Sequence, residues 1–124
     1  MKIIISNSSN EPIYSQISSQ IKALILKGEL EEGAMLPSIR NLARDLQVSV
    51  ITTKRAYEEL EKEGFVESVQ GKGSFIASQN KEIIKEKKLK IIEEKLMEVV
   101  EKSNLLGISY QEIQEMLKIL FEEV

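Results

Sequence analysis

Apolar residues recur at helical spacing in the first part of the chain, after a typical helix start. Asn10-Glu11-Pro12 forms that start, because proline is tolerated in a first turn and Asn or Glu can meet the free amide groups. The apolar positions that follow are Tyr14, Ile17, Ile21, Leu24 and Ile25. The pattern predicts a helix that ends at Lys27-Gly28, where glycine suits the left-handed conformation. A connector follows, with a short extended piece around Met35.

Two further helices with a tight turn between them are predicted after Pro37. Ser38 is a good N-cap candidate for a short helix whose apolar positions are Ile39, Leu42, Ala43 and Leu46. Gln47-Val48 makes the turn, and Ser49 is placed to cap the next helix. The inner face of that helix carries Thr53, Ala56, Tyr57 and Leu60. The other faces, which are free to bind a partner, carry Val50, Ile51, Lys54, Arg55 and Glu58.

A hairpin is predicted directly after this helix pair. Gly64 ends the third helix, residues 65–69 alternate weakly like a strand, and residues 74–77 form the returning strand. The glycines of Gln70-Gly71-Lys72-Gly73 suit a tight loop with positive φ. Two helices, a tight turn and a Gly-tipped hairpin in this order outline a winged helix-turn-helix, which favours DNA binding.

The rest of the chain is predicted to form two amphipathic helices. The first runs from Glu82 to about Asn104, with a broad apolar stripe of Ile84, Leu89, Ile91, Ile92, Leu96, Met97, Val99 and Val100. Residues 105–108 break it, and Ser109-Tyr110-Gln111-Glu112 is a capping-box pattern. The last helix carries Ile113, Met116, Leu117, Leu120 and Phe121. Two such helices cannot bury both stripes alone, so we expect a partner surface, most simply a second copy of the chain.

The predicted fold class is therefore mainly α with a small β-hairpin (α+β). Residues 1–78 are expected to form a winged helix-turn-helix that binds DNA, and residues 79–124 a two-helix dimerisation or regulatory appendage. A chain of 124 residues suits one small domain with an appendage and leaves no room for a separate catalytic domain.

Composition excludes several function classes. Cysteine and histidine are both absent, which rules out thiolate zinc sites, cysteine nucleophiles and histidine general bases. No apolar run approaches the roughly 20 residues that a membrane helix needs. Gly71-Lys72-Gly73-Ser74 resembles a phosphate loop only faintly, because the spacing and the following helix are missing. We expect a cytoplasmic protein that is not an enzyme and needs no cofactor or metal.

The net charge of −3 argues at first sight against a polyanionic partner, but its distribution matters more. Residues 1–80 hold nine Lys/Arg against ten Asp/Glu, and residues 81–124 hold eight against ten. Within the first part, the predicted DNA-facing stretch contains Arg40, Arg44, Lys54, Arg55 and Lys72. The glutamates at positions 58–63 are expected to form a solvent face. The prediction is a local basic footprint on an acidic body, with a modest salt dependence per protomer.

Individual residues of the third helix have structural as well as functional interpretations. Ser49 is expected to cap the helix, and the same hydroxyl can touch a phosphate. Lys54 and Arg55 would also fit a solvated face. Val50 and Ile51 are more informative. Exposure to solvent is a poor explanation for two β-branched apolar residues on the outer side of a first helical turn, but these residues could contact the methyl groups of thymine. The alternative is that one of the two packs on the wing.

These motifs resemble the GntR family of bacterial transcription regulators. The resemblance rests on Leu36-Pro37-Ser38-Ile39-Arg40, on the third helix with Val48-Ser49 and Ala56-Tyr57, and on Gly71-Lys72-Gly73-Ser74-Phe75 at the expected separation. It covers residues 10–77. The short two-helix tail, with no ligand-binding or aminotransferase-like domain after it, resembles the YtrA subfamily.

The resemblance implies a set of DNA-contacting residues and a mode of binding. Arg40 would contact DNA from the start of the second helix, and the wing tip would enter the minor groove. Val50 stands where some relatives carry an arginine that reads guanine, which favours a more A/T-rich site. The family binds palindromic operators as a dimer. The whole candidate set is Ser38, Arg40, Ser49, Val50, Ile51, Thr52, Lys54, Arg55, Gln70, Gly71, Lys72 and Gly73.

The sequence leaves open whether a small-molecule effector regulates the protein. If one does, we expect it to bind in the groove between the tail and the winged domain. The sequence also leaves open a different class of function, a protein-interaction adaptor in which the winged helix docks another protein. The acidic pI of about 5.2 favours the adaptor slightly. The placement of Arg40, Lys54, Arg55 and Lys72 favours DNA.

Overall fold

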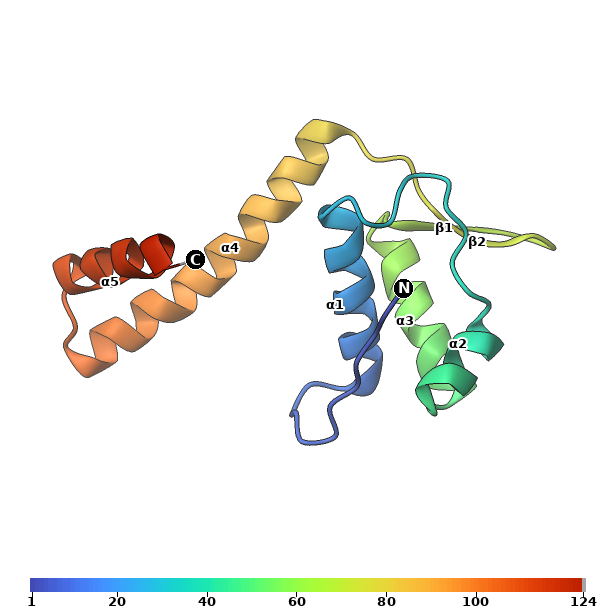
Figure 1. The fold of residues 1–124 in the computed structure, drawn as a ribbon, viewed down its shortest axis with the longest axis horizontal. Helices are drawn as coiled ribbons and strands as arrows, with labels where there is room; N and C mark the ends of the chain where they lie inside the picture. Colours follow the sequence, from blue (N-terminus) through green and yellow to red (C-terminus); the bar gives the residue numbers. More distant parts are fainter. Residues whose placement is uncertain (124) are drawn as a thin grey trace. The chain divides into compact units, whose positions relative to one another are not determined.

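A computed structural model describes residues 1–123 of the chain (Figure 1). It contains five helices and one two-stranded antiparallel hairpin within these residues, which confirms the predicted class of a mainly α protein with a small β-hairpin. The chain gathers into two compact units that divide between Ile84 and Lys85, and each is described below by itself. The domain boundary predicted after residue 78 stays a prediction.

Helix α1, Ile13–Leu26, forms the back of the first unit. Pro12 occupies its N-cap position, and the helix ends at Lys27, whose amide donates to the carbonyl of Ala23 at 2.9 Å. Gly28 follows with φ of +82°, the left-handed conformation predicted for it. Ile17 and Ile21 are completely buried, so the apolar stripe read from the sequence is the face that packs on the rest of the unit.

The N-terminal segment is held along α1 by two glutamine side chains. The Gln16 carboxamide accepts from the Ser6 amide at 2.8 Å and donates to the Ser6 carbonyl at 3.0 Å. The Gln20 carboxamide does the same with Ile4, at 2.9 and 2.7 Å. Each glutamine side chain therefore bonds to both the N–H and the C=O group of one backbone residue, as a neighbouring β-strand would. Ile3 and Ile5 alternate with these residues and pack against the core.

Helices α2, Ile39–Leu46, and α3, Val50–Lys62, form the predicted helix-turn-helix. Ser38 caps α2 by accepting from the Asn41 amide at 3.1 Å, and Ser49 caps α3 by accepting from the Thr52 amide at 3.0 Å. Gln47 makes the turn between them in the left-handed region, with φ of 57°. Both predicted N-caps are therefore confirmed.

The core of the first unit lies between α1, α2, α3 and the hairpin. It consists of Ile17, Ile21, Ile25, Leu26, Leu36, Leu42, Ala56, Tyr57, Leu60, Phe65, Val66 and Ile76. Ala56 is completely buried, and Ala43 nearly so, which lets the neighbouring helices approach closely. Ile84, in the first turn of the long tail helix, also packs against this cluster.

The hairpin pairs β1, Val66–Val69, with β2, Gly73–Ile76, in the register Val66↔Ile76 and Val69↔Gly73. The connector that precedes α2 lies along the other edge of β2. The Leu36 amide donates to the Ser74 carbonyl at 2.9 Å, and the Gly33 amide donates to the Ile76 carbonyl at 2.8 Å. Met35 forms a bridge with Phe75. The extended piece predicted around Met35 thus lies beside β2 and pairs with it through backbone hydrogen bonds.

The second unit is built on the helices α4, Lys81–Leu106, and α5, Tyr110–Glu123. The sequence predicted a break over residues 105–108, but Leu105 and Leu106 are helical. The helix continues to Gly107, whose φ of +71° ends it. The predicted capping box is confirmed, since the Glu112 amide donates to the Ser109 hydroxyl at 3.2 Å and the Ser109 amide donates to the Glu112 carboxylate at 2.9 Å.

Candidate nucleic-acid interface

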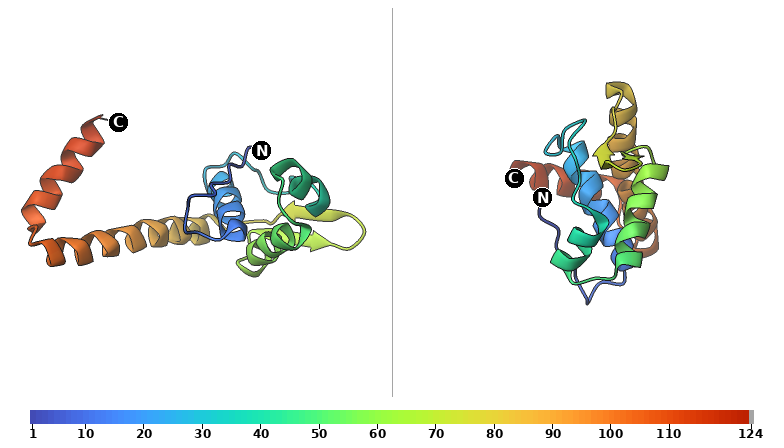
Figure 2. Two further views of the ribbon diagram at one scale, coloured as in Figure 1. Left: turned by 90° about the horizontal axis from the view of Figure 1, so that it is seen from below. Right: turned by 90° about the vertical axis from the view of Figure 1, so that its right-hand side faces the viewer.

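The candidate residues lie on three elements of the first unit: the start of α2, the start of α3 and the tip of the hairpin. Figure 2 shows these elements grouped on one side of α1, with the hairpin loop projecting beyond the helices. The core behind them fixes their backbones, because α2 and α3 pack on each other and the hairpin directly follows α3. The structure therefore brings the sequence-predicted residues together on one part of the unit.

The outer side of α3 presents two apolar side chains to solvent. Val50 is 51% exposed and Ile51 is 82% exposed, whereas Thr53, Ala56, Tyr57 and Leu60 on the inner face are all buried. The alternative that one of the pair packs on the wing does not account for Ile51, given its exposure. An isolated apolar pair at the first turn of a helix is suited to contact the methyl groups of thymine in a major groove.

The hydroxyl groups at the start of α3 are arranged in a chain. Ser49 Oγ accepts from the Thr52 amide and donates its own proton to Thr52 Oγ1 at 2.7 Å. Because the Ser49 proton is used in this way, the hydroxyl proton of Thr52 is the one free to be donated outward. Thr52 is half-buried and Ser49 is exposed. The arrangement makes Thr52 the better hydrogen-bond donor to a phosphate.

Arg40 is exposed on α2 and has no ion pair or hydrogen bond from its side chain to any described residue. Arg44, one turn further along, contacts Asn41 Oδ1 at 3.2 Å and Asp45 at 4.0 Å. The guanidinium of Arg40 is therefore the more available of the two for a phosphate or a base edge.

Lys54 and Arg55 make different contacts although they are neighbours on α3. Lys54 Nζ lies 3.9 Å from Glu58 Oε1 in an exposed pair, which contributes little to stability and leaves the ammonium available. The Arg55 guanidinium lies 3.8 Å from the ring centroid of Tyr14 on α1. This stacking turns Arg55 toward α1, an orientation that the helical periodicity of α3 did not reveal.

The hairpin tip is exposed and carries one lysine. Gln70, Gly71, Lys72 and Gly73 are all exposed, and the two glycines have φ of +79° and +118°. The Lys72 amide closes the turn on the Val69 carbonyl at 2.9 Å. The Lys72 ammonium has no carboxylate partner among the described residues. A free cation on a projecting loop is suited to a phosphate or to the minor groove.

Tyr57 links α3 to the start of α2, a contact that sequence reasoning missed. Its hydroxyl donates to the Pro37 carbonyl at 2.7 Å, directly before the Ser38 cap and close in sequence to Arg40. Burial raises the pKa of Tyr57 well above its usual range. The ring is part of the core, so the apolar periodicity identified Tyr57 as buried but carried no signal for its hydrogen bond.

We predict that Tyr57→Phe lowers the free energy of unfolding by about 1 to 2 kcal/mol, because the Pro37 carbonyl loses its donor. The usual pKa of 10.0 rises on folding, so the wild type must lose stability as the pH rises above 10, and the variant should lose less there. Urea unfolding at neutral and alkaline pH measures both effects. Tyr14→Phe is the matched control, because the Tyr14 hydroxyl has no hydrogen bond to a described residue. This variant should change the free energy of unfolding little. Equal effects of the two variants would contradict the role given to the Tyr57 hydroxyl.

The described residues contain no cluster of acidic side chains that could hold a metal ion. None of the helices described is long and apolar enough to cross a membrane. The candidate surface presents exposed cations, hydroxyl groups and apolar side chains on a helix-turn-helix with a wing.

Comparison with known families agrees with this geometry. Residues 13–76 match the family described as "Bacterial regulatory proteins, gntR family". The chain belongs to the GntR family. This GntR chain is 35% identical to the HTH-type transcriptional repressor YtrA of Bacillus subtilis over 98% of its own length and 94% of that protein's. The resemblance to YtrA-like regulators is thus confirmed over nearly the whole chain, tail included.

Solved structures of regulators extend the comparison to the fold. A GntR family transcriptional regulator from Listeria monocytogenes has a TM-score of 0.79 and 32% identity, with coverage of 92% of this chain and 97% of that one. The DNA-binding domain of AraR, solved in complex with operator ORX1, has a TM-score of 0.55 and 26% identity, with coverage of 62% and 96%. The chain is a DNA-binding transcription regulator, and its family consists of regulators rather than enzymes.

Proposed function

We propose that the protein represses transcription in the cytoplasm by binding a palindromic operator as a homodimer. The observation that carries the proposal is the pair of exposed apolar side chains, Val50 and Ile51, on the first turn of α3, with the unpaired cations Arg40 and Lys72 on the elements that flank it. The similarity to the repressor YtrA over most of both chains supports repression rather than activation.

Each element has a distinct task in this proposal. The first turn of α3 enters the major groove, where Val50 and Ile51 contact thymine methyl groups and Lys54 contacts the backbone. The Thr52 hydroxyl and the Arg40 guanidinium hold phosphates. Lys72 and the glycine-rich loop around it enter the adjacent minor groove. Because Val50 brings no hydrogen-bond donor, the operator should be richer in A/T than one read by an arginine at this position.

Arg55 is the member of the candidate set whose contact differs most from expectation. Its side chain stacks on Tyr14, so it would reach a phosphate only along the edge of α1. Ser38 and Ser49 act mainly as helix caps, which orient Arg40 and Thr52. Gln70, Gly71 and Gly73 shape the loop that presents Lys72.

The experiment that tests the function is selection of bound duplexes from a random pool at low and at high salt. The expected result is a palindrome whose half-sites lie about one helical turn apart, roughly 34 Å, with binding that weakens as salt increases. Enrichment of no sequence at either salt concentration would overturn the proposal. Salt-independent capture of a protein partner would instead favour the adaptor function.

We predict that Lys72→Ala weakens binding by a similar factor on specific and nonspecific duplexes, because a wing ammonium mainly meets phosphate. The slope of log affinity against log salt should fall by about 1 per protomer. Fluorescence anisotropy over a salt series measures both. Lys62→Ala, at the opposite end of α3 from the cap, is the matched control and should leave the slope unchanged. A loss confined to one operator would contradict a phosphate contact.

A further inference from the structure

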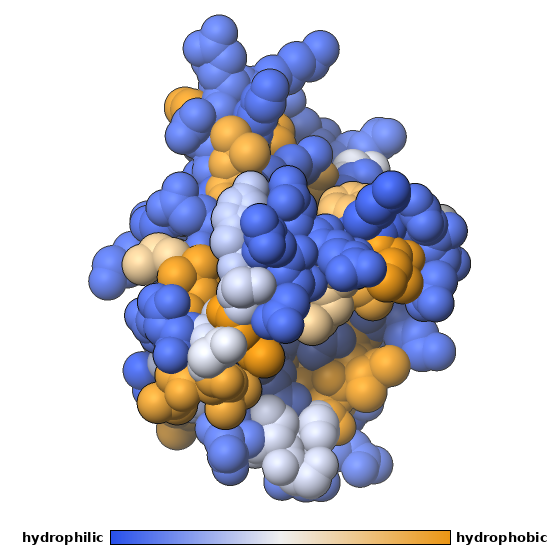
Figure 3. Space-filling view, turned by 90° about the vertical axis from the view of Figure 1, so that its left-hand side faces the viewer, coloured by the Kyte–Doolittle hydropathy of each residue, from blue (hydrophilic) through white to orange (hydrophobic). Residues whose placement is uncertain are grey.

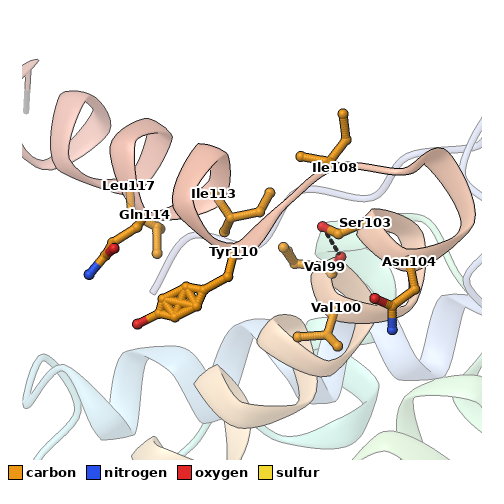
Figure 4. A pocket seen from close by; sticks show the side chains of 9 residues that line it. All are labelled: Val99, Val100, Ser103, Asn104, Ile108, Tyr110, Ile113, Gln114 and Leu117. Atoms are coloured by element: carbon orange, nitrogen blue, oxygen red, sulfur yellow. Dashed lines mark hydrogen bonds between the residues drawn. The ribbon is translucent and has the colours of Figure 1, made fainter.

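The cavity between α4 and α5 is apolar and unsuited to an anion. Its walls enclose about 370 Å³, and no charged side chain of a described residue lines it. Figure 4 shows the lining side chains, with the Ser103 hydroxyl donating to the Val99 carbonyl at 2.7 Å. Figure 3 shows hydrophobic side chains gathered among hydrophilic ones on the face that it presents. Apolar surfaces of this kind suit the homodimer of the proposed function, so further contacts with the DNA backbone are expected on the first unit.

Helices α1 and α3 lie side by side and run in the same direction. The Arg55 guanidinium lies 3.8 Å from the ring centroid of Tyr14, and Lys22 forms an ion pair with Glu63. This second pair lies eight residues further along each segment. The first turn of α1 therefore lies at the same end of the unit as the first turn of α3, which the proposed function places in the major groove. Figure 1 shows both helices starting at the lower end of the first unit.

Arg55 does not pair with the carboxylate that follows it on its own helix. Glu59 lies at the i, i+4 spacing at which side chains of a helix meet. The Arg55 side chain nevertheless makes no ion pair or hydrogen bond with a described residue and stacks on Tyr14 instead. Stacking occupies the face of a guanidinium and leaves the N–H groups around its edge free to donate. Because the side chain is exposed, these donors are accessible at the start of α1.

Tyr14 provides a fixed support for this cation and a second donor beside it. The ring is half-buried and packs against the core cluster, which holds it in place. Its hydroxyl has no hydrogen bond to a described residue. The acidic residue closest to Tyr14 along the chain is Glu11, whose carboxylate accepts from the hydroxyls of Ser15 at 2.8 Å and Ser19 at 3.3 Å. A supported guanidinium and a free hydroxyl therefore lie together without a carboxylate partner.

We propose that Tyr14 and Arg55 bind one phosphate of the DNA backbone, beside the groove that α3 enters. This inference rests on the DNA-binding surface of the proposed function and extends that surface to α1. Arg55 makes a bidentate contact with the phosphate oxygens, and the Tyr14 hydroxyl donates a further hydrogen bond. The Tyr14 ring is in addition a positioning group, because it holds the guanidinium before DNA arrives and so lowers the entropy lost on binding.

The position of the pair favours DNA over a free anion. Since α1 and α3 are parallel, the positive ends of both helix dipoles lie at this end of the unit. Double-stranded DNA carries a charge about every 1.7 Å of its axis. A duplex that meets the first turn of α3 therefore brings backbone phosphates to the neighbouring start of α1. The occupant that fits Tyr14 and Arg55 is thus a phosphate of the same duplex.

The first test removes the cation from the full-length chain. Arg55→Ala should weaken binding about tenfold, both on a duplex of arbitrary sequence and on the operator obtained by selection. The slope of log affinity against log salt should fall by about 1 per protomer. Lys27→Ala removes the same charge at the opposite end of α1 and should change neither quantity. Fluorescence anisotropy over a salt series measures both variants.

The second test separates the hydroxyl of Tyr14 from its ring. Tyr14→Phe keeps the ring and should weaken binding about threefold, whereas Tyr14→Leu removes the ring as well and should weaken binding about tenfold. Neither should change the salt slope, because Arg55 keeps its charge. In the Arg55→Ala background the Phe and Leu variants should bind DNA equally, since the ring has no guanidinium left to hold. A difference of the same size in both backgrounds would show a merely structural ring and overturn the positioning role.

The third test locates the phosphate. Single phosphates of the operator are replaced by uncharged methylphosphonates, and the wild type should lose affinity at one position per half-site where Arg55→Ala loses nothing further. Wild-type affinity of Arg55→Ala on every duplex, or an equal loss in Lys27→Ala, would overturn this site and leave the proposed function intact. A wild type that binds no duplex would overturn both. Thermal stabilisation by inorganic phosphate that Arg55→Ala abolishes, with DNA binding unchanged, would overturn the DNA contact in favour of a free anion.

Discussion

A chain that ends at Ile84 is expected to fold, to be monomeric and to bind the palindromic operator about 10² to 10⁴ times more weakly than the full chain. Folding is expected because the whole core cluster, from Ile17 to Ile76, is retained, together with Ile84, which packs against it. The loss of affinity follows because two half-sites are no longer bound by linked domains, so the second contact stops being intramolecular. Analytical ultracentrifugation gives the oligomeric state, and anisotropy with full and half operators gives the affinity.

The half-site provides the control for this truncation. The truncated and the full-length chain should bind a single half-site with similar affinity, since the candidate contact residues all precede residue 85. Fusing an unrelated antiparallel coiled coil after Ile84 should recover part of the lost affinity. A truncated chain that still dimerises in solution would place the interface in the winged unit and would contradict the proposed role of α4 and α5.

Replacing Arg40 by alanine is expected to weaken operator binding by about 10- to 100-fold, equivalent to about 1 to 3 kcal/mol for a charge-assisted contact. The side chain is exposed and has no partner among the described residues, so thermal stability should change little. Anisotropy and thermal unfolding of the same samples separate the two quantities.

Arg44→Ala is the matched control for Arg40, because both arginines lie on α2. Arg44 is already engaged by Asn41 and Asp45, so its removal should weaken DNA binding less. If Arg40→Ala binds the operator like the wild type, Arg40 does not belong to the interface. If both variants lose affinity equally, the contact is a diffuse electrostatic one and not a defined contact of Arg40.

Local signals in the sequence were enough to locate most of the elements. The hydroxyl caps Ser38 and Ser49 and the capping box at Ser109 act within three residues, so the sequence contains both partners side by side. Glycine conformations are equally local, as at Gly28. The end of α4 was predicted two residues early because Leu105 and Leu106 are compatible with either state, and Gly107 decides the boundary.

Contacts between distant residues were beyond such reasoning. The Tyr57 hydroxyl reaches Pro37, 20 residues earlier, and Arg55 stacks on Tyr14 of another helix. Periodicity assigns a residue to a face but says nothing about which side chain of a neighbouring helix lies opposite. The pattern of helices and hairpin therefore predicts which surface faces DNA. The DNA contact of each residue on that surface stays a proposal. The cavity described lies between α4 and α5, and an effector site against the winged unit stays a prediction.

The connector before α2 has a consequence for how the operator can be spaced. Its backbone pairs with β2, and the Pro37 carbonyl that follows is held by Tyr57, so the wing and the start of α2 share one hydrogen-bonded frame. These hydrogen bonds therefore hold the first turn of α3 and Lys72 at a fixed separation. Inserting one base pair between the major-groove and minor-groove parts of a half-site would move them apart by about 3.4 Å along the axis. Because the two elements are held at a fixed separation, we expect the protein to lose either the major-groove contact of α3 or the minor-groove contact of Lys72.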